Sequence, residues 1–271
     1  MAPIITFTTD FGLRDPYVAE MKGVILGIAG AGAQLVDVTH DVQRHDVAEA
    51  ALALEAAAPY FPAGTVHLAV VDPGVGTSRR GLVVVSRGQL FVGPDNGLLT
   101  PFLTGDEWSA FEIASAEHRL PVVSRTFHGR DVFAPAAAYL AGGVTPAQLG
   151  PAVGDPVRLA WAEMREVAGA IAGSVVHVDR FGNLVTSIHA DSVTGLGTET
   201  RLRVSGRLLR MVGTYGDLDR GEVGALRGSS GRLEIAAREA SAAALLKARR
   251  GTPVLVSRTI SPAKKRVRRL P

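Results

Sequence analysis

Hydrophobic and polar residues follow two different patterns along the chain. In the first half, short apolar runs alternate with stretches in which apolar residues recur every three or four positions. The short runs are typical of buried β-strands, and the second spacing is typical of amphipathic helices. Strands are expected at 4–10, 34–40, 66–72, 82–86, 89–93 and 111–115, with helices from Asp15, Asp46 and Asp131. This alternation predicts a layered α/β domain with a mainly parallel sheet.

The predicted helices carry recognisable end signals. Asp15 and Pro16 read as an N-cap and first-turn pair, and Gly30 ends that helix. Asp46 with Glu49 three residues later has the spacing of a capping box.

The second half contains mostly short β-like runs. They lie at 170–179, 183–189, 201–206, 207–213, 222–226, 232–237 and 253–258, with one short helix at 241–247. This pattern favours a small β-barrel or sandwich. Residues 150–167 combine Gly, Pro and charge without clear periodicity. The expected division is an α/β domain at 1–160, a linker at 161–167, a β-barrel domain at 168–260 and a basic tail at 261–271.

Composition narrows the class of protein. The chain of 271 residues is 46% hydrophobic and has no cysteine, so a sizeable core is expected and disulfides, thiolate nucleophiles and Cys-ligated metals are excluded. It shows neither a membrane-length apolar run nor a signal-peptide pattern, and we expect a cytoplasmic protein without a membrane partner.

The positive charge is concentrated at one end. Five basic residues lie within the last eight positions, and without them the net charge of +3 becomes −2. Such a terminal run is typical of a solvated tail, so no nucleic-acid partner is expected.

Polar residues follow several predicted strands at their carboxyl ends, where open α/β sheets bind ligands. They are Thr8, Thr9, Asp10, Asp37, Thr39, His40, Asp41, Asp72, Asp95 and Asn96. If the strands are parallel neighbours, these residues share one rim. Any one of these carboxylates could equally cap a turn.

The segment after Asp72 has the strongest sequence signal for a site. In VVDPGVGTSRR, two glycines permit a tight turn, and Arg79 and Arg80 bring positive charge back toward the carboxylate. The segment lacks the Lys-Ser/Thr ending of a phosphate-binding P-loop. Elsewhere, GIAGAG at 27–32 closes a helix, whereas a dinucleotide-binding fingerprint opens one, so this second motif is excluded as well. His128 lies in a Gly-containing loop just before a helix, the same kind of position as the strand-end carboxylates.

Seven motifs together resemble one family. TTDFGLRDPYVAEMKG, DVTHDV, VDPGVGTSRR, GPDNG, TFHGRD, DRFGN and SSGRLEIA occur in order along nearly the whole chain. They are similar to the S-adenosylmethionine hydroxide adenosyltransferase family, which is related to the fluorinating and chlorinating enzymes. The resemblance implies an α/β domain followed by a β-barrel, a homotrimer with sites between neighbouring subunits, and no metal or cofactor. The implied reaction converts S-adenosylmethionine and water to adenosine and L-methionine.

The resemblance also implies roles for individual residues. Asp72, Arg79 and His128 match the set that handles the nucleophilic water, and Asp10 matches the carboxylate that holds the ribose hydroxyls. The other implied substrate contacts are Asp179 for the methionine ammonium, Phe181 as a wall, Asn183 for adenine, Ser229 for the amino-acid end, and Glu234 and Ala237 along the adenosine site. Arg232 stands where the family pattern leads one to expect an aromatic residue such as Tyr.

The chemistry of the residues fits attack by water. Displacing a neutral thioether from a sulfonium needs no general acid, so activating the nucleophile is the difficulty. A histidine near pKa 6.5 is a better base at neutral pH than an aspartate near 3.9. The resulting hypothesis is that Asp72 orients the water, Arg79 favours developing hydroxide and His128 supports deprotonation. If burial raises the pKa of Asp72, Asp72 and His128 exchange these roles. The alternatives are a halide-dependent adenosyltransferase, which a carboxylate at position 72 disfavours, and a non-catalytic adenosine or S-adenosylmethionine sensor.

Overall fold

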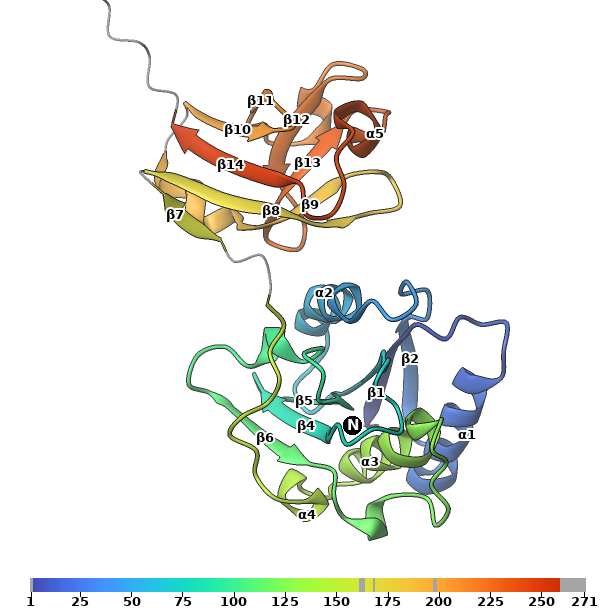
Figure 1. Cartoon of the computed structure of the whole chain (residues 1–271). Coiled ribbons are helices and arrows are strands. Elements are labelled where there is room, and N and C mark those ends of the chain that lie inside the picture. The colour runs from blue at the N-terminus through green and yellow to red at the C-terminus, as the bar shows by residue number, and fades with distance from the viewer. Residues whose placement is uncertain (1, 161–163, 168, 197–198, 259–271) are drawn as a thin grey trace, which may run out of the picture. The chain divides into compact units, whose positions relative to one another are not determined.

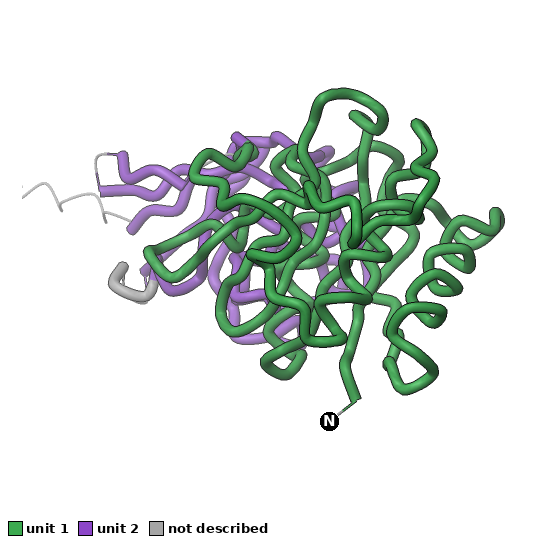
Figure 2. Tube along the Cα trace, turned by 90° about the horizontal axis from the view of Figure 1, so that it is seen from below, with its two compact units in different colours: residues 1–159 green, residues 160–271 purple. Residues whose placement is uncertain are grey.

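The structure is a computed structural model that describes residues 2–160, 164–167, 169–196 and 199–258 (Figure 1). The chain forms two compact units, Met1–Leu159 and Ala160–Pro271 (Figure 2). Each unit has its own hydrophobic core.

Unit 1 is built on a six-stranded sheet in the order β2-β1-β3-β5-β4-β6. The strands are β1 (Ile4–Thr9), β2 (Gln34–Thr39), β3 (Val66–Val70), β4 (Gly81–Ser86), β5 (Gln89–Pro94) and β6 (Trp108–Glu112). Strands β2, β1, β3 and β5 run parallel, whereas β4 is antiparallel to both β5 and β6. The predicted mainly parallel sheet is confirmed, with an antiparallel edge formed by the hairpin at Arg87 and Gly88.

Helices cover both faces of this sheet (Figure 1). They are α1 (Tyr17–Ala29), α2 (Val47–Ala57), α3 (Ala134–Ala141) and the short α4 (Pro146–Leu149). Helices α1 and α3 pack on one face with Leu68 and Val70, while α2 packs on the other with Ala69 and Val71. Successive residues of a strand point to opposite faces, so the continuous apolar run of β3 supplies both cores. Shorter helical turns are η1 (Ala58–Tyr60), η2 (Thr100–Phe102), η3 (Ala116–His118) and η4 (Gly129–Phe133).

The helix ends partly match the sequence predictions. Asp46 accepts a hydrogen bond from the Glu49 amide at 3.0 Å, as expected of an N-cap, but the Glu49 carboxylate reaches Gln43 N at 3.3 Å and does not complete a capping box. The predicted cap by Asp15 is wrong, because α1 begins after Pro16 without a side-chain cap. The helix expected from Asp131 begins instead with the π-helical turn η4, so that Asp131 is turned into the protein interior.

Unit 2 is an antiparallel barrel-like sheet in the order β11-β10-β14-β8-β9-β13-β12. Its strands are β7 (Arg165–Val167), β8 (Ala170–Val178), β9 (Leu184–His189), β10 (Thr200–Val204), β11 (Arg207–Arg210), β12 (Val223–Arg227), β13 (Arg232–Ala237) and β14 (Pro253–Arg258), and its helices are η5 (Ala190–Leu196), η6 (Tyr215–Asp217) and α5 (Ala242–Leu246). The two outermost strands approach each other where Val212 N donates to Ala225 O at 2.8 Å, which nearly closes the barrel. The barrel prediction is confirmed.

The expected linker and the expected basic tail were both predicted to be irregular. Within the expected linker, residues 165–167 form β7 and pair with β8. The predicted basic tail lies outside the described residues. Within the described part of the chain, no helix is long and apolar enough to cross a membrane.

Candidate functional site

The parallel strands of unit 1 end at one edge of the sheet. Because β1, β2, β3 and β5 all run in the same direction, the residues after them share the rim that the sequence analysis anticipated. Asp10 follows β1, Asp72 comes shortly after β3, and Asp95 follows β5. The fold thus gathers carboxylates that are up to 85 residues apart in the chain.

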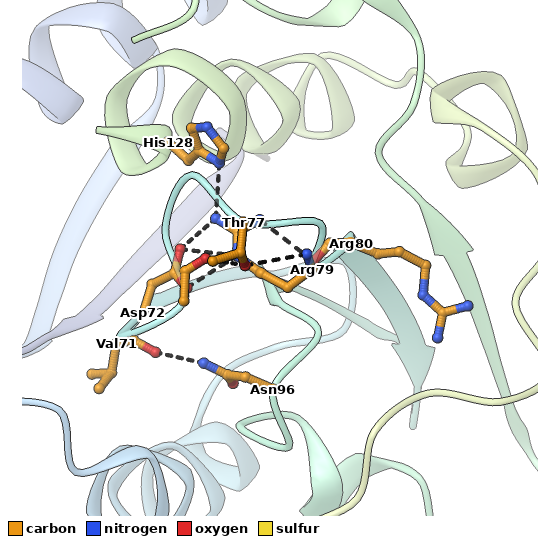
Figure 3. A network of polar contacts seen from close by, with 8 residues as sticks. Val71, Asp72, Thr77, Arg79, Arg80, Asn96 and His128 are labelled. Carbon is orange, nitrogen blue, oxygen red and sulfur yellow. Dashed lines mark hydrogen bonds and ion pairs between the residues drawn. The ribbon is translucent and has the colours of Figure 1, made fainter. Parts of the chain in front are cut away.

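Asp72, Arg79 and His128 are in direct contact (Figure 3). Arg79 Nε donates to both carboxylate oxygens of Asp72 at 3.0 Å, and its Nη2 also donates to Asp72 Oδ2. The same Nη2 lies 2.9 Å from His128 Nδ1. The side chains of Asp72 and Arg79 are only 6% and 11% exposed, so this ion pair is shielded from bulk water. The three residues implied to handle water therefore form one hydrogen-bonded set.

The glycine-rich turn folds Arg79 back onto Asp72. Val75 N donates to Asp72 O and Thr77 N to Gly74 O, which closes two successive turns. Gly76 has a φ of +77°, and a Cβ there would lie 2.3 Å from the carbonyl oxygen of Arg125. Only glycine permits both this backbone conformation and this close approach. The turn thus packs directly against the loop that carries His128.

The contact with Arg79 fixes the protonation of His128. A guanidinium has only donors, so His128 Nδ1 must accept this hydrogen bond and Nε2 carries the ring proton. Burial and, second, the positive charge of Arg79 lower the pKa of His128 below its ordinary value. His128 is therefore held neutral, with an N–H as its remaining polar group.

A pocket of about 300 Å³, which we call the strand-end pocket, joins this set to Asp10. Its lining comprises Asp10, Phe11, Asp15, Tyr17, Arg44, His45, Val70, Asp72, Val75, Thr126, Phe127, His128 and Gly129. Asp10 is oriented by His45 N, which donates to its Oδ2 at 2.9 Å. Asp10, Asp72 and His128 thus face one cavity, with Arg79 behind the last two.

Three aromatic rings form part of this pocket and were not anticipated from the sequence. Phe11, Tyr17 and Phe127 pack edge to face, with ring centroids 5.1–5.9 Å apart. They come from two loops and a helix start, positions where periodicity carries no signal. Their position within the motifs TTDFGLRDPYVAEMKG and TFHGRD was the only available indication.

Arg80 does not join the site, which corrects the expectation that both arginines return toward Asp72. Its side chain points away from Asp72 and His128 (Figure 3) and donates to Asp95 at 2.8 Å and to Asp155 at 2.8 Å. Asp95 also accepts from Val157 N at 2.7 Å. This part of the rim therefore ties residues 155–157 to the sheet.

Other polar residues of the rim hold loops in place. His40 is 5% exposed and its Nδ1 lies 2.8 Å from Thr9 Oγ1, which links the ends of β1 and β2. Asn96 donates to Val71 O at 2.8 Å (Figure 3). Lys22 donates to Asp37 at 2.7 Å. Burial raises the pKa of Asp37, but the hydrogen bonds from Lys22 and His40 outweigh it, so that pKa lies below its ordinary value.

In unit 2, Asp179 organises the loop DRFGN. Its Oδ1 accepts from the amides of Phe181 at 2.9 Å and Asn183 at 2.8 Å, and its Oδ2 accepts from Asn183 Nδ2 at 3.0 Å. The loop presents Phe181 outward with 79% of its surface exposed. Asp179 and Asn183 thus bind each other, and these hydrogen bonds already use part of their binding capacity.

A second cavity of about 640 Å³, the barrel pocket, lies beside this loop. Its lining comprises Phe181, Asn183, Tyr215, Ala237, Arg238, Glu239 and Ala240. Tyr215, which the sequence analysis did not single out, donates to Glu234 Oε1 at 2.7 Å. This bond, with burial and the nearby negative charges, raises the pKa of Tyr215 to about 12.

The remaining predicted contacts lie apart from this lining. Glu234 is 8% exposed and reaches the barrel pocket through Tyr215. Ser229 is exposed on the turn before β13 and does not line the barrel pocket. Arg232, which occupies the position of the expected aromatic residue, is 9% exposed and pairs with His189 across β13 and β9. Among the described residues, no three His, Asp or Glu side chains are arranged to hold a metal ion.

Known proteins share this combination of units. The family model described as the SAM hydroxide adenosyltransferase N-terminal domain matches residues 5–150, and that of the C-terminal domain matches residues 173–255. The chain is 41% identical over 262 residues to the (R)-S-adenosyl-L-methionine hydrolase of Thermus thermophilus, covering 94% of this chain and 99% of that protein. A fluorinase from an Actinoplanes species is 31% identical, covering 74% of this chain and 78% of the relative.

A solved structure agrees with the sequence comparisons. The crystal structure of an uncharacterized conserved protein from Thermotoga maritima matches with a TM-score of 0.85 at 34% identity, covering 94% of this chain and all of that one. The family models together cover most of the chain, and the relatives align over nearly its whole length. The chain therefore belongs to the SAM hydroxide adenosyltransferase family.

Proposed function

We propose that this protein hydrolyses S-adenosyl-L-methionine to adenosine and L-methionine, by attack of water on the ribose 5′ carbon. The observation that carries the proposal is the Asp72–Arg79–His128 set, which meets Asp10 in the strand-end pocket. The hydrolase names of relatives at 41% identity support the same reaction.

The set is suited to activating a water rather than a leaving group. Methionine leaves as a neutral thioether, so the enzyme needs no acid on that side. The incoming water must lose a proton, and preorganised charges around it supply the stabilisation of the developing hydroxide. Arg79 supplies the positive charge.

The hydrogen bond between Arg79 and His128 changes the roles first assigned to the set. The single lone pair of neutral His128 is used by Arg79, so His128 cannot also accept a proton from water while that bond persists. We therefore assign proton acceptance to the carboxylate of Asp72, which keeps unused lone pairs, and propose that His128 Nε2–H donates to the attacking oxygen. Asp10 holds the ribose hydroxyls.

Further substrate contacts are assigned to residues of unit 2. Asp179 and Asn183 are assigned to the methionine ammonium and adenine, Phe181 and Ala237 to the walls, and Glu234 and Ser229 to further contacts. Support comes from the barrel pocket, which Phe181, Asn183 and Ala237 line together.

A product assay in isotopically labelled water tests the reaction. Label in the 5′ hydroxyl of adenosine, with equimolar methionine, is the expected result. Product containing a 5′ halogen in the presence of fluoride or chloride would make the protein a halide adenosyltransferase. Tight binding of intact substrate by calorimetry without methionine release would make it a sensor.

Four variants test the site itself. Asp72→Asn, Arg79→Ala, His128→Ala and Asp10→Ala are each expected to slow adenosine release by about 100-fold or more, because each loses a group that faces the pocket or, for Arg79, the charge that stabilises developing hydroxide. Wild-type rates in all four would remove the strand-end pocket from consideration. Circular dichroism of each variant confirms that it is folded.

The names of the relatives specify the configuration of the sulfonium. The sulfur of S-adenosylmethionine is a stereocentre, and the relatives are named as hydrolases of the (R) epimer. We propose the same preference for this protein. Separate assays of the two sulfonium epimers test it, and equal kcat/KM for both would contradict it.

We also propose a homotrimer with sites between neighbouring subunits, located in the cytoplasm. Support for the assembly is the family membership. Light scattering of the purified protein measures the first, and cell fractionation measures the second.

A further inference from the structure

A buried carboxylate outside the proposed catalytic set lies beneath the loop that carries His128. Asp131, in the π-helical turn η4, is 0% exposed. Its Oδ2 accepts from Ser124 N at 2.8 Å, and its main-chain oxygen accepts from Leu120 N at 2.9 Å. Asp131 N in turn donates to Phe127 O at 3.2 Å. One residue thus binds the loop 120–128 at its beginning, middle and end.

The charge of Asp131 is offset by its neighbour in sequence. Arg130 Nε donates to Asp131 Oδ1 at 2.6 Å, and its Nη2 donates to Oδ2 at 3.2 Å. Arg130 also reaches Glu20 on α1 at 2.8 Å and lies 5.2 Å above the ring of Phe127, which lines the strand-end pocket. A buried carboxylate with this arrangement holds its partners in place only while both oxygens act as acceptors.

We propose that Asp131 is a positioning residue that holds the loop 120–128 so that His128 reaches Arg79. The loop contacts the Asp72 turn where Gly76 packs on Arg125 O. Three residues after Arg125, His128 Nδ1 lies 2.9 Å from Arg79 Nη2. A loop held at three points by Asp131 keeps both contacts. Its effect on catalysis rests on the proposed function, whereas its effect on His128 does not.

A variant of the same size and shape tests whether the negative carboxylate of Asp131 is needed or only its volume. In the wild type, both carboxylate oxygens of Asp131 face hydrogen-bond donors. In Asp131→Asn, an NH₂ donor replaces one of these oxygens, so either Ser124 N or Arg130 loses its acceptor. Glu20→Gln is the matched control, because it weakens the other ion pair of Arg130 and leaves Asp131 bonded to Ser124.

Two measurements need no substrate. We expect the Ser124 amide to exchange with solvent at least about ten-fold faster in Asp131→Asn than in wild type. We also expect the pKa of His128, followed by NMR, to rise toward its ordinary value, because burial is the main cause of its lowering. The charged groups that act on His128 are Arg79, Asp72, Arg119 and Asp131. Loss of the Asp131 charge alone would lower the pKa, so the sign of the change distinguishes release of the loop from loss of charge.

Activity supplies the third measurement. We expect kcat for adenosine release to fall by about ten-fold in folded Asp131→Asn, with Glu20→Gln close to wild type. An unchanged amide exchange rate and an unchanged or lowered pKa of His128 would overturn the inference whatever the activity. Absence of hydrolysis in the wild type would refute the proposed function and leave the NMR result valid.

A second pair of variants makes the test independent of a buried substitution. Ser124→Pro removes the N–H that Asp131 accepts and keeps every charge, whereas Ser124→Ala removes only the hydroxyl. The proposal requires a raised pKa of His128 in the first variant and a wild-type value in the second. Equal values in both would overturn it.

Discussion

Replacing Gly76 by alanine should separate the two loops that form the proposed catalytic set. The added Cβ would lie 2.3 Å from Arg125 O, whereas ordinary contact begins at 3.4 Å, so one loop must move by about 1 Å. If that movement is along the line to His128, the 2.9 Å contact with Arg79 opens to nearly 4 Å, beyond hydrogen-bonding distance. A misplacement of about 1 Å at a reacting centre costs about 100-fold in rate.

A matched glycine on the same turn supplies the control. In Gly74→Ala the nearest atom to the new Cβ is Arg79 Cγ at 3.4 Å, which is ordinary contact, and Gly74 has no positive φ. Gly76 has a φ of +77°, where alanine costs about 1–2 kcal/mol.

The assay compares kcat/KM for adenosine release and the thermal midpoint of both variants with those of wild type. We expect about a 100-fold loss for Gly76→Ala, a lower midpoint, and less than about a three-fold change for Gly74→Ala. Equal activity of the two variants would refute the reasoning, because it would mean that the contact between the loops does not place His128.

Three further outcomes follow from the described contacts. Replacing Arg79 by Met should raise the pKa of His128 measured by NMR, because the guanidinium charge lowers it in the wild type; an unchanged titration would contradict this. Burial lowers the pKa of His67 to about 4 from 6.5. The free energy of unfolding should therefore be highest above pH 6.5 and fall by about 3 kcal/mol as the pH drops toward 4. Urea unfolding across this range should show this decline in the wild type, and His67→Gln should lack it. In Tyr215→Phe, Glu234 loses its donor and the barrel pocket a polar group; KM should rise by about ten-fold with a smaller change in kcat, and the tyrosinate absorbance that titrates near pH 12 should disappear.

Much of the fold could be predicted from the sequence because its signals are local. The spacing of apolar residues located most strands of both units and the longer helices, although it missed β7 and α4. The change of pattern after residue 150 separated an α/β half from a β half. Asp46 was recognised as a cap because its partner lies three residues away. Asp15 was misassigned: it does not cap α1, and it lines a cavity together with Phe127, which is more than 100 residues distant.

The candidate site was predicted in its members but not in its working arrangement. Strand ends and the family motifs identified Asp10, Asp72, Arg79 and His128. The structure brings the two aspartates and the histidine to one pocket, with Arg79 bonded to Asp72 and His128. Apart from the family motif, no pattern of composition or spacing distinguishes Arg79, which binds Asp72, from Arg80, which turns away. The choice depends on Asp95 and Asp155, which only the fold places beside Arg80.

By itself, the sequence determined the succession of strands and helices, the polar strand ends and the motifs of the family, since each depends on residues close together in the chain. Only the tertiary structure decided that His128 accepts from Arg79 and that Asp131 is buried beneath its loop. The physical reason is that a proton position and a buried charge are set by all surrounding groups at once. Those groups come together only when the segments that carry them pack against one another.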